Sequence, residues 1–235
     1  MRVVDLTTPL NEGSNIVYPG YAFLRKIPIL NYENHVIMSS NVEIWLHAGT
    51  HVDAPLHVVR DGKSIDEAEL SKFVGEAVIL DLTKTISHSS PILRKTLEYA
   101  YTELKRKGEE IKTGDIIVLR TDWSTRYNPA SSEYREKAPY LTEEAVDWLL
   151  DRKPSAVGFD FPEERIDKLK ETLGSGKPKE QPLPLHVKLL GNGVYLIEHL
   201  TNLNQLTRSR FILAAAPLKI KGAEGSPVRA FAIEL

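Results

Sequence analysis

Residues 47–57 read HAGTHVDAPLH and hold three of the seven histidines in this 235-residue chain. An even scatter would place about a third of one histidine in such a window. An aspartate, Asp53, lies between the second and the third histidine. Imidazoles beside a carboxylate are a donor set that divalent metals bind. The stretch therefore predicts a metal site that includes His47, His51 and Asp53.

The residues between these histidines argue against a helix. Gly49, the β-branched Thr50 and Val52, and Pro55 all disfavour helical backbone. Strand geometry fits better, because residues 42–53 alternate: the even positions are Val, Ile, Leu, Ala, Thr and Val, and the odd ones are Glu, Trp, His, Gly, His and Asp.

A straight strand would nevertheless place His47 and His51 too far apart. Their Cα atoms would be separated by about 13 Å, near the limit for two imidazoles on one ion. We therefore expect a bend at Gly49, where glycine allows it without steric cost. Pro55 then fixes the exit of the chain, so that His57 can return toward the site.

The composition indicates one domain over residues 1–235 that acts on a small molecule. The chain is 42% hydrophobic and has no Ser/Gly-rich or Pro-rich linker. Its 30 basic and 32 acidic residues nearly cancel, which argues against a nucleic-acid groove or a membrane-surface patch. The absence of cysteine excludes disulfides, thiolate metal sites and a cysteine nucleophile. The first residues lack the apolar core of a signal peptide and 211–218 is too short to span a bilayer, so a cytoplasmic location is expected.

Short apolar runs between turn signals predict strands, and fewer segments predict helices. The expected strands are 3–6, 36–46, 77–82, 116–120, 156–159, 194–197, 211–215 and 229–233. Residues 91–107 have apolar side chains at helical spacing, and Thr142 is expected to cap a helix over 143–150. A third, exposed helix over 167–173 and a mobile loop over 174–180 are also expected.

The motifs of the chain resemble one known family. The complete HxGTHxDxPxH pattern over residues 47–57 resembles the signature of the metal-dependent cyclase or kynurenine formamidase-like hydrolases. Other segments resemble that family in the same order: 5–7, 18–20, 114–121, 157–160, His186, 197–203, 217–219 and 225–230. The resemblance spans nearly the whole chain, and several motifs in the right order make a chance match improbable.

The resemblance implies an α/β fold of the swivelling β/β/α type, with a mixed sheet and a few flanking helices. It also implies two divalent ions, usually zinc with manganese as the alternative, and hydrolysis of small-molecule amides. His47, His51 and Asp53 match ligands of the first ion, and His186 matches a ligand of the second. Asp53 and Glu198 match carboxylates that reach both ions. A homodimer or larger homo-oligomer is implied as well.

His57 matches the catalytic acid/base of the family rather than a ligand. Its unperturbed pKa of about 6.5 suits a group that takes a proton from water and returns it to a leaving nitrogen. Tyr18 is the candidate for stacking on an aromatic substrate, although the formamidase branch favours tryptophan at that position.

The remaining histidines are expected to be structural. His35, His88 and His199 are of this kind, and His199 should point to the face of its strand opposite Glu198. Gly225 and Ser226 are expected in a turn.

Three functions remain open from the sequence. The first is hydrolysis of N-formylkynurenine or a related aryl formamide. The second is opening of a cyclic amide or imide of the isatin type, and Glu198 favours the first because a dinuclear site needs a second bridging carboxylate. The third is a non-catalytic metal-binding or sensing protein, against which the extra acid/base His57 argues.

Overall fold

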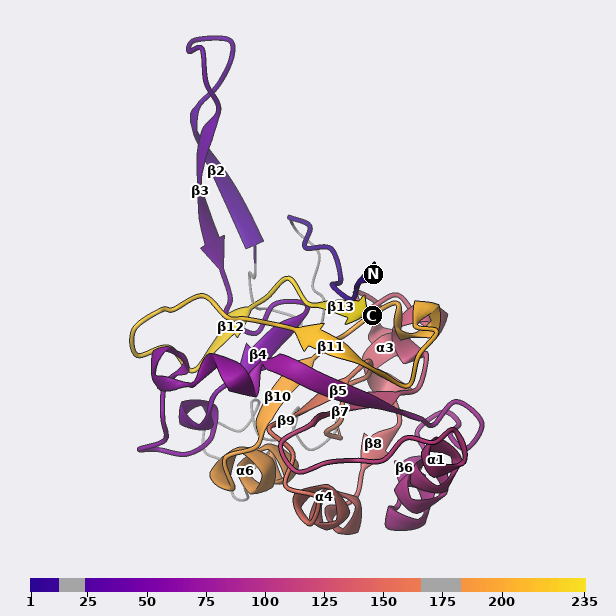
Figure 1. The fold of residues 1–235 in the computed structure, drawn as a ribbon. Helices are drawn as coiled ribbons and strands as arrows, with labels where there is room; N and C mark the ends of the chain where they lie inside the picture. The colour runs from indigo at the N-terminus through magenta and orange to yellow at the C-terminus, as the bar shows by residue number, and fades with distance from the viewer. Residues whose placement is uncertain (13–23, 166–182) are drawn as a thin grey trace.

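The computed structural model describes residues 1–12, 24–165 and 183–235. Its body is a nine-stranded mixed sheet in the order β1-β13-β11-β5-β7-β9-β10-β4-β12 (Figure 1). The strands of this sheet are β1 (Arg2–Asp5), β4 (His51–Asp53), β5 (Val74–Asp81), β7 (Ile116–Arg120), β9 (Ala156–Phe159), β10 (Tyr195–Glu198), β11 (Arg210–Ala214), β12 (Gly225–Pro227) and β13 (Phe231–Glu234). The expected α/β class, with a mixed sheet and a few helices, is confirmed.

The longer helices pack along one face of the sheet (Figure 1). They are α1 (Arg94–Arg106), α4 (Glu143–Leu150) and α6 (Pro184–Gly191). The shorter elements are α2 (Trp123–Arg126), α3 (Ser132–Glu136), the paired strands β6 (Pro91–Ile92) and β8 (Tyr140–Leu141), and the 3-10 turns at 55–57, 65–67, 70–72 and 203–205.

Two hydrophobic cores lie on opposite faces of the central strands. On β7, Ile117 and Leu119 belong to the core under the helices, whereas Ile116 and Val118 belong to the core on the other face. Strands β5, β7, β9 and β10 are parallel neighbours, and parallel strands covered on both faces are apolar at nearly every position. This explains why these strands appear in the sequence as nearly continuous apolar runs.

Most elements expected from the sequence are present. The strands β7 and β9 match the expected ranges to the residue, and the other expected strands agree within three residues at each end. The helices α1 and α4 are confirmed, with Thr142 at the N-cap of α4. Helix α1 begins three residues later than expected, because Pro91 and Ile92 form strand β6. The helix expected over 167–173 and the loop over 174–180 lie outside the described residues.

The bend at Gly49 is confirmed, but it separates two strands instead of kinking one. Gly49 has a φ of 59°, in the left-handed region. Before it, β3 (Ser39–Ile44) ends at Ile44, and after it β4 begins at His51 in a different sheet.

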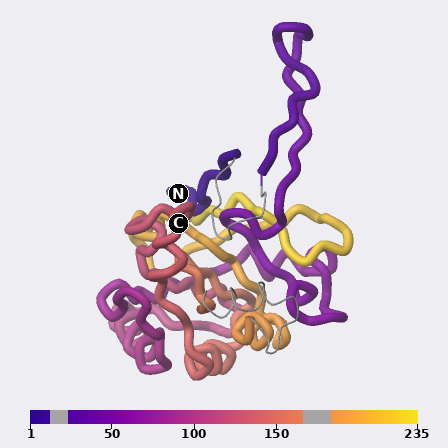
Figure 2. The backbone as a smooth tube through the Cα atoms, turned by 180° about the vertical axis from the view of Figure 1, so that it is seen from behind, coloured from indigo at the N-terminus to yellow at the C-terminus, as the bar shows by residue number. Residues whose placement is uncertain are grey.

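A long β-hairpin projects from the body. It pairs β2 (Leu24–Leu30) with β3, antiparallel, and it stands away from the nine-stranded sheet in two opposite views (Figures 1 and 2). The two termini lie close together on the body of the molecule, where β1 and β13 pair (Figure 1). Among the described residues, no helix has the length and apolar character needed to cross a membrane.

Candidate metal centre

Strand β4 supplies two of the expected site residues and its neighbour supplies a third. His51 and Asp53 are two positions apart on β4, so their side chains leave the same face. In the antiparallel pairing of β4 with β10, Glu198 lies directly opposite His51. Cross-strand partners share a face, which brings the Glu198 carboxylate to the two β4 side chains.

His47 reaches the same place from the turn that precedes β4. Its Nδ1 lies 2.7 Å from Asp53 Oδ1, and both side chains are buried. Gly225 of β12 makes room for this contact, because a Cβ there would lie 3.0 Å from His47 Cε1 and 2.8 Å from the Val52 carbonyl oxygen. Gly225 and Ser226 thus belong to a buried strand, and their expected placement in a turn is wrong.

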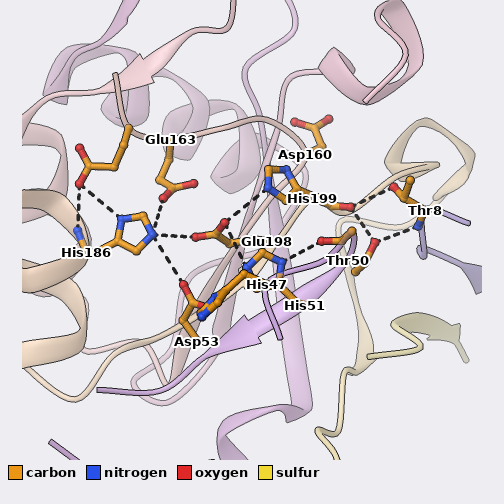
Figure 3. A network of polar contacts seen from close by, with 12 residues as sticks. Thr8, His47, Thr50, His51, Asp53, Asp160, Glu163, His186, Glu198 and His199 are labelled. Carbon is orange, nitrogen blue, oxygen red and sulfur yellow. Dashed lines mark hydrogen bonds and ion pairs between the residues drawn. The ribbon is translucent and has the colours of Figure 1, made fainter. Parts of the chain in front are cut away.

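Helix α6 brings in His186 from a distant part of the chain. Pro184 occupies the first turn of α6, where its missing N–H costs nothing. His186 Nε2 lies 2.9 Å from Glu198 Oε1, 3.2 Å from Glu163 Oε1 and 3.6 Å from Asp53 Oδ2. Figure 3 shows these side chains converging from separate segments.

Asp53 and Glu198 each direct one carboxylate oxygen to either side of the cluster. Asp53 Oδ1 lies 3.4 Å from His51 Nε2, and its Oδ2 faces His186. Glu198 Oε2 lies 3.5 Å from His51 Nε2, and its Oε1 faces His186. Each carboxylate therefore spans the space between the His51 side and the His186 side.

Hydrogen bonds on the outer nitrogens orient two of the imidazole rings. His51 Nδ1 lies 2.8 Å from the Gly49 carbonyl oxygen, which only accepts, so Nδ1 carries the proton and donates. His186 Nδ1 makes a longer contact of the same kind, 3.4 Å from Glu164 Oε1. Both rings therefore direct Nε2 toward Asp53 and Glu198, the arrangement that metal-binding histidines use. In the metal-free protein burial lowers the pKa of His186, but Glu163, Glu164 and Glu198 raise it well above its usual value, so its Nε2 carries a proton and donates to Glu198 Oε1.

His57 lies beside this cluster at the end of a 3-10 turn, Pro55–His57, and is half-buried. Its ring centroid is 4.1 Å from that of His47 and 5.8 Å from that of His186. Burial lowers the pKa of His57 to about 4; the Asp53 charge raises it, and the two neighbouring imidazoles lower it further. His57 is therefore neutral near pH 7 and has a lone pair that accepts a proton.

The carboxylates of the cluster are ionised in the metal-free protein. Burial and Asp53 raise the pKa of Glu198, but His186 and His51 lower it more, to about 2. Burial raises the pKa of Asp53 as well, and His47, His51 and His57 hold it well below its usual range. Glu163 differs, since burial and the nearby Glu198 charge raise its pKa well above the usual value.

The donor atoms fit a divalent metal. Three sets of ligand atoms lie within 4.8 Å of one another: His47–Asp53–His57, His51–Glu198–His199 and Asp53–His186–Glu198. Within the described residues, His47 Nε2 and Asp53 Oδ2 are buried and have no hydrogen-bond partner. Buried polar atoms are rarely left in this state, and a cation would satisfy them. Oxygen and imidazole donors without sulfur suit zinc or manganese.

The structure brings together six of the seven expected site residues, namely His47, His51, Asp53, His57, His186 and Glu198. Their roles as ligands and acid/base stay predictions. Tyr18 lies outside the described residues, and so does its expected contact with substrate.

The sequence reasoning missed several groups at the centre. Glu163 and Glu164 follow β9 and both approach His186, and Glu224 Oε1 lies 3.5 Å from His47 Nε2. The sequence spacing of these acids does not indicate a metal site, because only the tertiary fold brings them to the histidines. The expected orientation of His199 is wrong: its ring lies beside His51, with centroids 5.6 Å apart, on the same side as Glu198.

Comparison with known proteins identifies the family. The family described as "Putative cyclase" matches residues 4–164, more than half of the chain. The chain belongs to the cyclase family. The family expected from the sequence motifs is thus confirmed.

Relatives within the cyclase family cover nearly the whole chain. A kynurenine formamidase from Bacillus cereus is 27% identical over 228 residues, which are 97% of this chain and 95% of the relative. An isatin hydrolase from Roseibium aggregatum is 29% identical over 253 aligned positions, which cover 99% of this chain and 92% of the relative. A solved structure titled "The Structure Of Potential Metal-Dependent Hydrolase With Cyclase Activity" superposes with a TM-score of 0.73 at 26% identity, covering 100% of this chain and 98% of that one.

Proposed function

We propose that this cyclase-family chain is a metal-dependent hydrolase that cleaves an amide C–N bond of a small molecule, with an aryl formamide such as N-formylkynurenine as its substrate. One observation carries the proposal: Asp53 and Glu198 each direct one carboxylate oxygen toward His51 and the other toward His186. A pair of carboxylates in this arrangement suits two adjacent cations. The names of the relatives, kynurenine formamidase and isatin hydrolase, support amide hydrolysis.

The proposed centre holds two divalent ions, zinc first and manganese as the alternative. His47, His51 and Asp53 would hold one ion, and His186 would hold the other. Asp53 and Glu198 would contribute to both, because a carboxylate has two oxygens and a neutral imidazole has one lone pair. When bound, such ions polarise a carbonyl oxygen and make water far more acidic.

His57 is the proposed proton carrier. A neutral ring nitrogen of His57 takes a proton from the attacking water, whose oxygen adds to the amide carbon. The same proton then goes to the departing nitrogen as the C–N bond breaks, which leaves a carboxylic acid and an amine. Acid/base help of this kind is worth about a hundredfold to ten-thousandfold in rate.

Opening of a cyclic amide of the isatin type is the second candidate, because the same addition of water would serve it and one relative bears that name. Glu198 favours the formamide, since it completes the bridging pair expected of a dinuclear site. The predicted contact of Tyr18 with an aromatic substrate and the cytoplasmic location stay predictions from the sequence.

A substrate panel tests the proposed function. Protein stripped with a chelator is given zinc or manganese and assayed with N-formylkynurenine, isatin and simple cyclic imides. We expect metal-dependent hydrolysis of N-formylkynurenine. Preference for isatin would select the second candidate. Inactivity on every compound despite stoichiometric bound metal would contradict hydrolysis and favour a metal-binding or sensing role.

We also propose that a second copy of the chain covers the β2–β3 hairpin, in line with the expected homo-oligomer. The exposed large apolar side chains of this hairpin are Ile29, Tyr32, Val36, Ile37, Met38 and Val42. A two-stranded hairpin alone is marginally stable in water, so such a surface needs a partner. Residues 24–44 carry two basic and two acidic side chains, so no net charge repels an identical copy. Symmetric dimers commonly use one patch on both subunits.

A further inference from the structure

One buried imidazole at the centre has no part in the proposed mechanism. His199 is 1% exposed, and its Nε2 lies 3.5 Å from Glu198 Oε2. That distance is too long for a good hydrogen bond, and within the described residues Nε2 has no hydrogen-bond partner. Figure 3 shows the ring directed toward Glu198 and the ring of His51. A buried nitrogen in this state indicates a missing ligand.

The backbone holds His199 in a conformation that faces the centre. Its φ is 53°, in the left-handed region that residues other than glycine seldom adopt. This break in the strand alternation lets Glu198 and His199, although consecutive, point to the same side. The His199 carbonyl oxygen accepts hydrogen bonds from Thr50 Oγ1 at 2.7 Å and from Thr8 Oγ1 at 3.2 Å. Such a conformation persists only where surrounding contacts determine it, and it is common at functional sites.

Tyr134 determines which nitrogen of His199 carries the proton. The Tyr134 hydroxyl lies 3.0 Å from His199 Nδ1 and 3.4 Å from the Asp160 carbonyl oxygen. That carbonyl can only accept, so the hydroxyl donates to it and accepts from Nδ1–H. The Nε2 atom is then left with a lone pair directed at the centre, as in His51.

We propose that His199 Nε2 is a further metal ligand, on the side of the centre that His51 and Glu198 share, and that Tyr134 positions it. Ligand atoms of these three residues lie within 4.8 Å of one another. The assignment rests on the proposed function, because it requires a metal centre. The assignment adds a neutral nitrogen donor to the ligands of the ion that His47, His51 and Asp53 would hold. A nitrogen donor of this kind suits zinc or cobalt.

The opposite tautomer would give His199 a different role. An Nε2–H group would donate to Glu198 and only orient that carboxylate. Tyr134 would then donate to Nδ1, and the Asp160 carbonyl oxygen would lose its contact with the hydroxyl. The two roles predict different metal spectra, so they are separable by experiment.

Cobalt titration of metal-free protein tests the assignment. The wild type, His199→Ala, His199→Gln and Tyr134→Phe are titrated with Co²⁺, whose visible absorption reports the number and type of ligands, and zinc affinity is measured by competition with a chelator. His35→Ala is the matched control, because His35 is exposed and lies on the hairpin. We expect both His199 variants to bind zinc at least about tenfold more weakly and to change the cobalt spectrum. Tyr134→Phe should weaken zinc binding less, and His35→Ala should behave as the wild type.

Wild-type zinc affinity and an unchanged cobalt spectrum in His199→Gln would overturn the assignment and leave His199 as a partner of Glu198. Because glutamine preserves polarity and much of the volume, this variant keeps the test valid if alanine disrupts folding. If wild-type protein takes up no metal, the centre as a whole is contradicted and His199 as a ligand with it. If wild-type protein binds metal and hydrolyses amides while the His199 variants match it, only the His199 assignment fails.

Discussion

Asp53 and Glu198 lie on adjacent antiparallel strands, and each directs one carboxylate oxygen toward His51 and the other toward His186. The register explains how they do so. Glu198 is the cross-strand partner of His51, and Asp53 follows His51 by two positions on the same face. Because α6 packs against β10, His186 meets the two carboxylates from the far side.

Replacement of His57 by alanine should separate turnover from metal binding. We expect turnover to fall about a hundredfold to ten-thousandfold while metal content stays at the wild-type level. The reason is that the proposed role of His57, which is half-buried beside His47, is proton transfer and not metal binding. Metal content is measured by elemental analysis and turnover by a formamide assay, with His35→Ala as control. Loss of metal in His57→Ala would make His57 a ligand, as its proximity to His47 and Asp53 also allows.

Gly225→Ala should disturb the centre through packing alone. An added Cβ would lie 2.8 Å from the Val52 carbonyl oxygen, closer than Cβ atoms approach other atoms in proteins, and 3.3 Å from Asp53 Oδ1, which is also a tight contact. We expect a loss of about 1–3 kcal/mol of unfolding free energy, measured by urea denaturation, together with weaker metal binding. Gly75→Ala is the matched control, since its Cβ would come no closer than 3.9 Å to the Ser71 carbonyl oxygen. Equal stability of the two variants would show that β12 shifts freely and that the close approach of Gly225 is not needed.

Glu234, which lies outside the metal centre, should make the stability of the fold depend on pH. Burial raises its pKa, but the backbone N–H groups of Arg208 and Thr207 and the side chains of Thr207 and Arg2 lower it more, so it lies below the ordinary 4.5. A lowered pKa in the folded state contributes stability above the unfolded value, and that stability is lost as pH falls through the folded value.

In metal-free protein, Glu234→Gln should therefore lower the free energy of unfolding by about 1–3 kcal/mol at pH 7. The difference in unfolding free energy from the wild type should shrink below about pH 4.3. Urea denaturation at both pH values measures it. Glu33→Gln on the exposed hairpin is the control and should show no such difference. If Glu234→Gln lowers the unfolding free energy equally at both pH values, the charge of Glu234 has no part in stability.

The hairpin should control assembly. Val36→Asp and Ile37→Asp place charges at the exposed end of the hairpin, and we expect each to shift the protein from dimer or larger toward monomer. Light scattering after size exclusion measures the mass. Tyr99→Asp, at an exposed aromatic on α1, is the matched control and should leave the mass unchanged. A wild-type protein that is monomeric at all concentrations would contradict the proposed second copy.

Local sequence patterns predicted the parts of the fold that local physics determines. The apolar runs of β7 and β9 are bounded by turn residues, and both strands match their expected ranges to the residue. Gly49 was identified as a bend because two imidazoles on one straight strand would lie too far apart. Helix α6 was not predicted, although Pro184 in its first turn and the spacing of Leu185 and Leu189 were available signals.

The remaining errors have tertiary causes. The predicted orientation of His199 was wrong because it assumed that side chains alternate along an unbroken strand. The positive φ of His199 ends this alternation just after Glu198. Glu163 and Glu224 were missed because each comes from a separate loop that only the folded sheet brings to the histidines. Resemblance to the family supplied His186 and Glu198, which the residues alone would not have connected to the first motif.

Anomalous X-ray diffraction at the zinc absorption edge, from crystals of zinc-loaded protein, tests the central claim most directly. The proposed centre predicts two anomalous peaks, one beside His47, His51 and Asp53 and one beside His186, with Asp53 and Glu198 between them. A single peak would contradict the bridging role of these carboxylates. Full zinc occupancy elsewhere on the molecule, with none among these side chains, would contradict the metal centre itself.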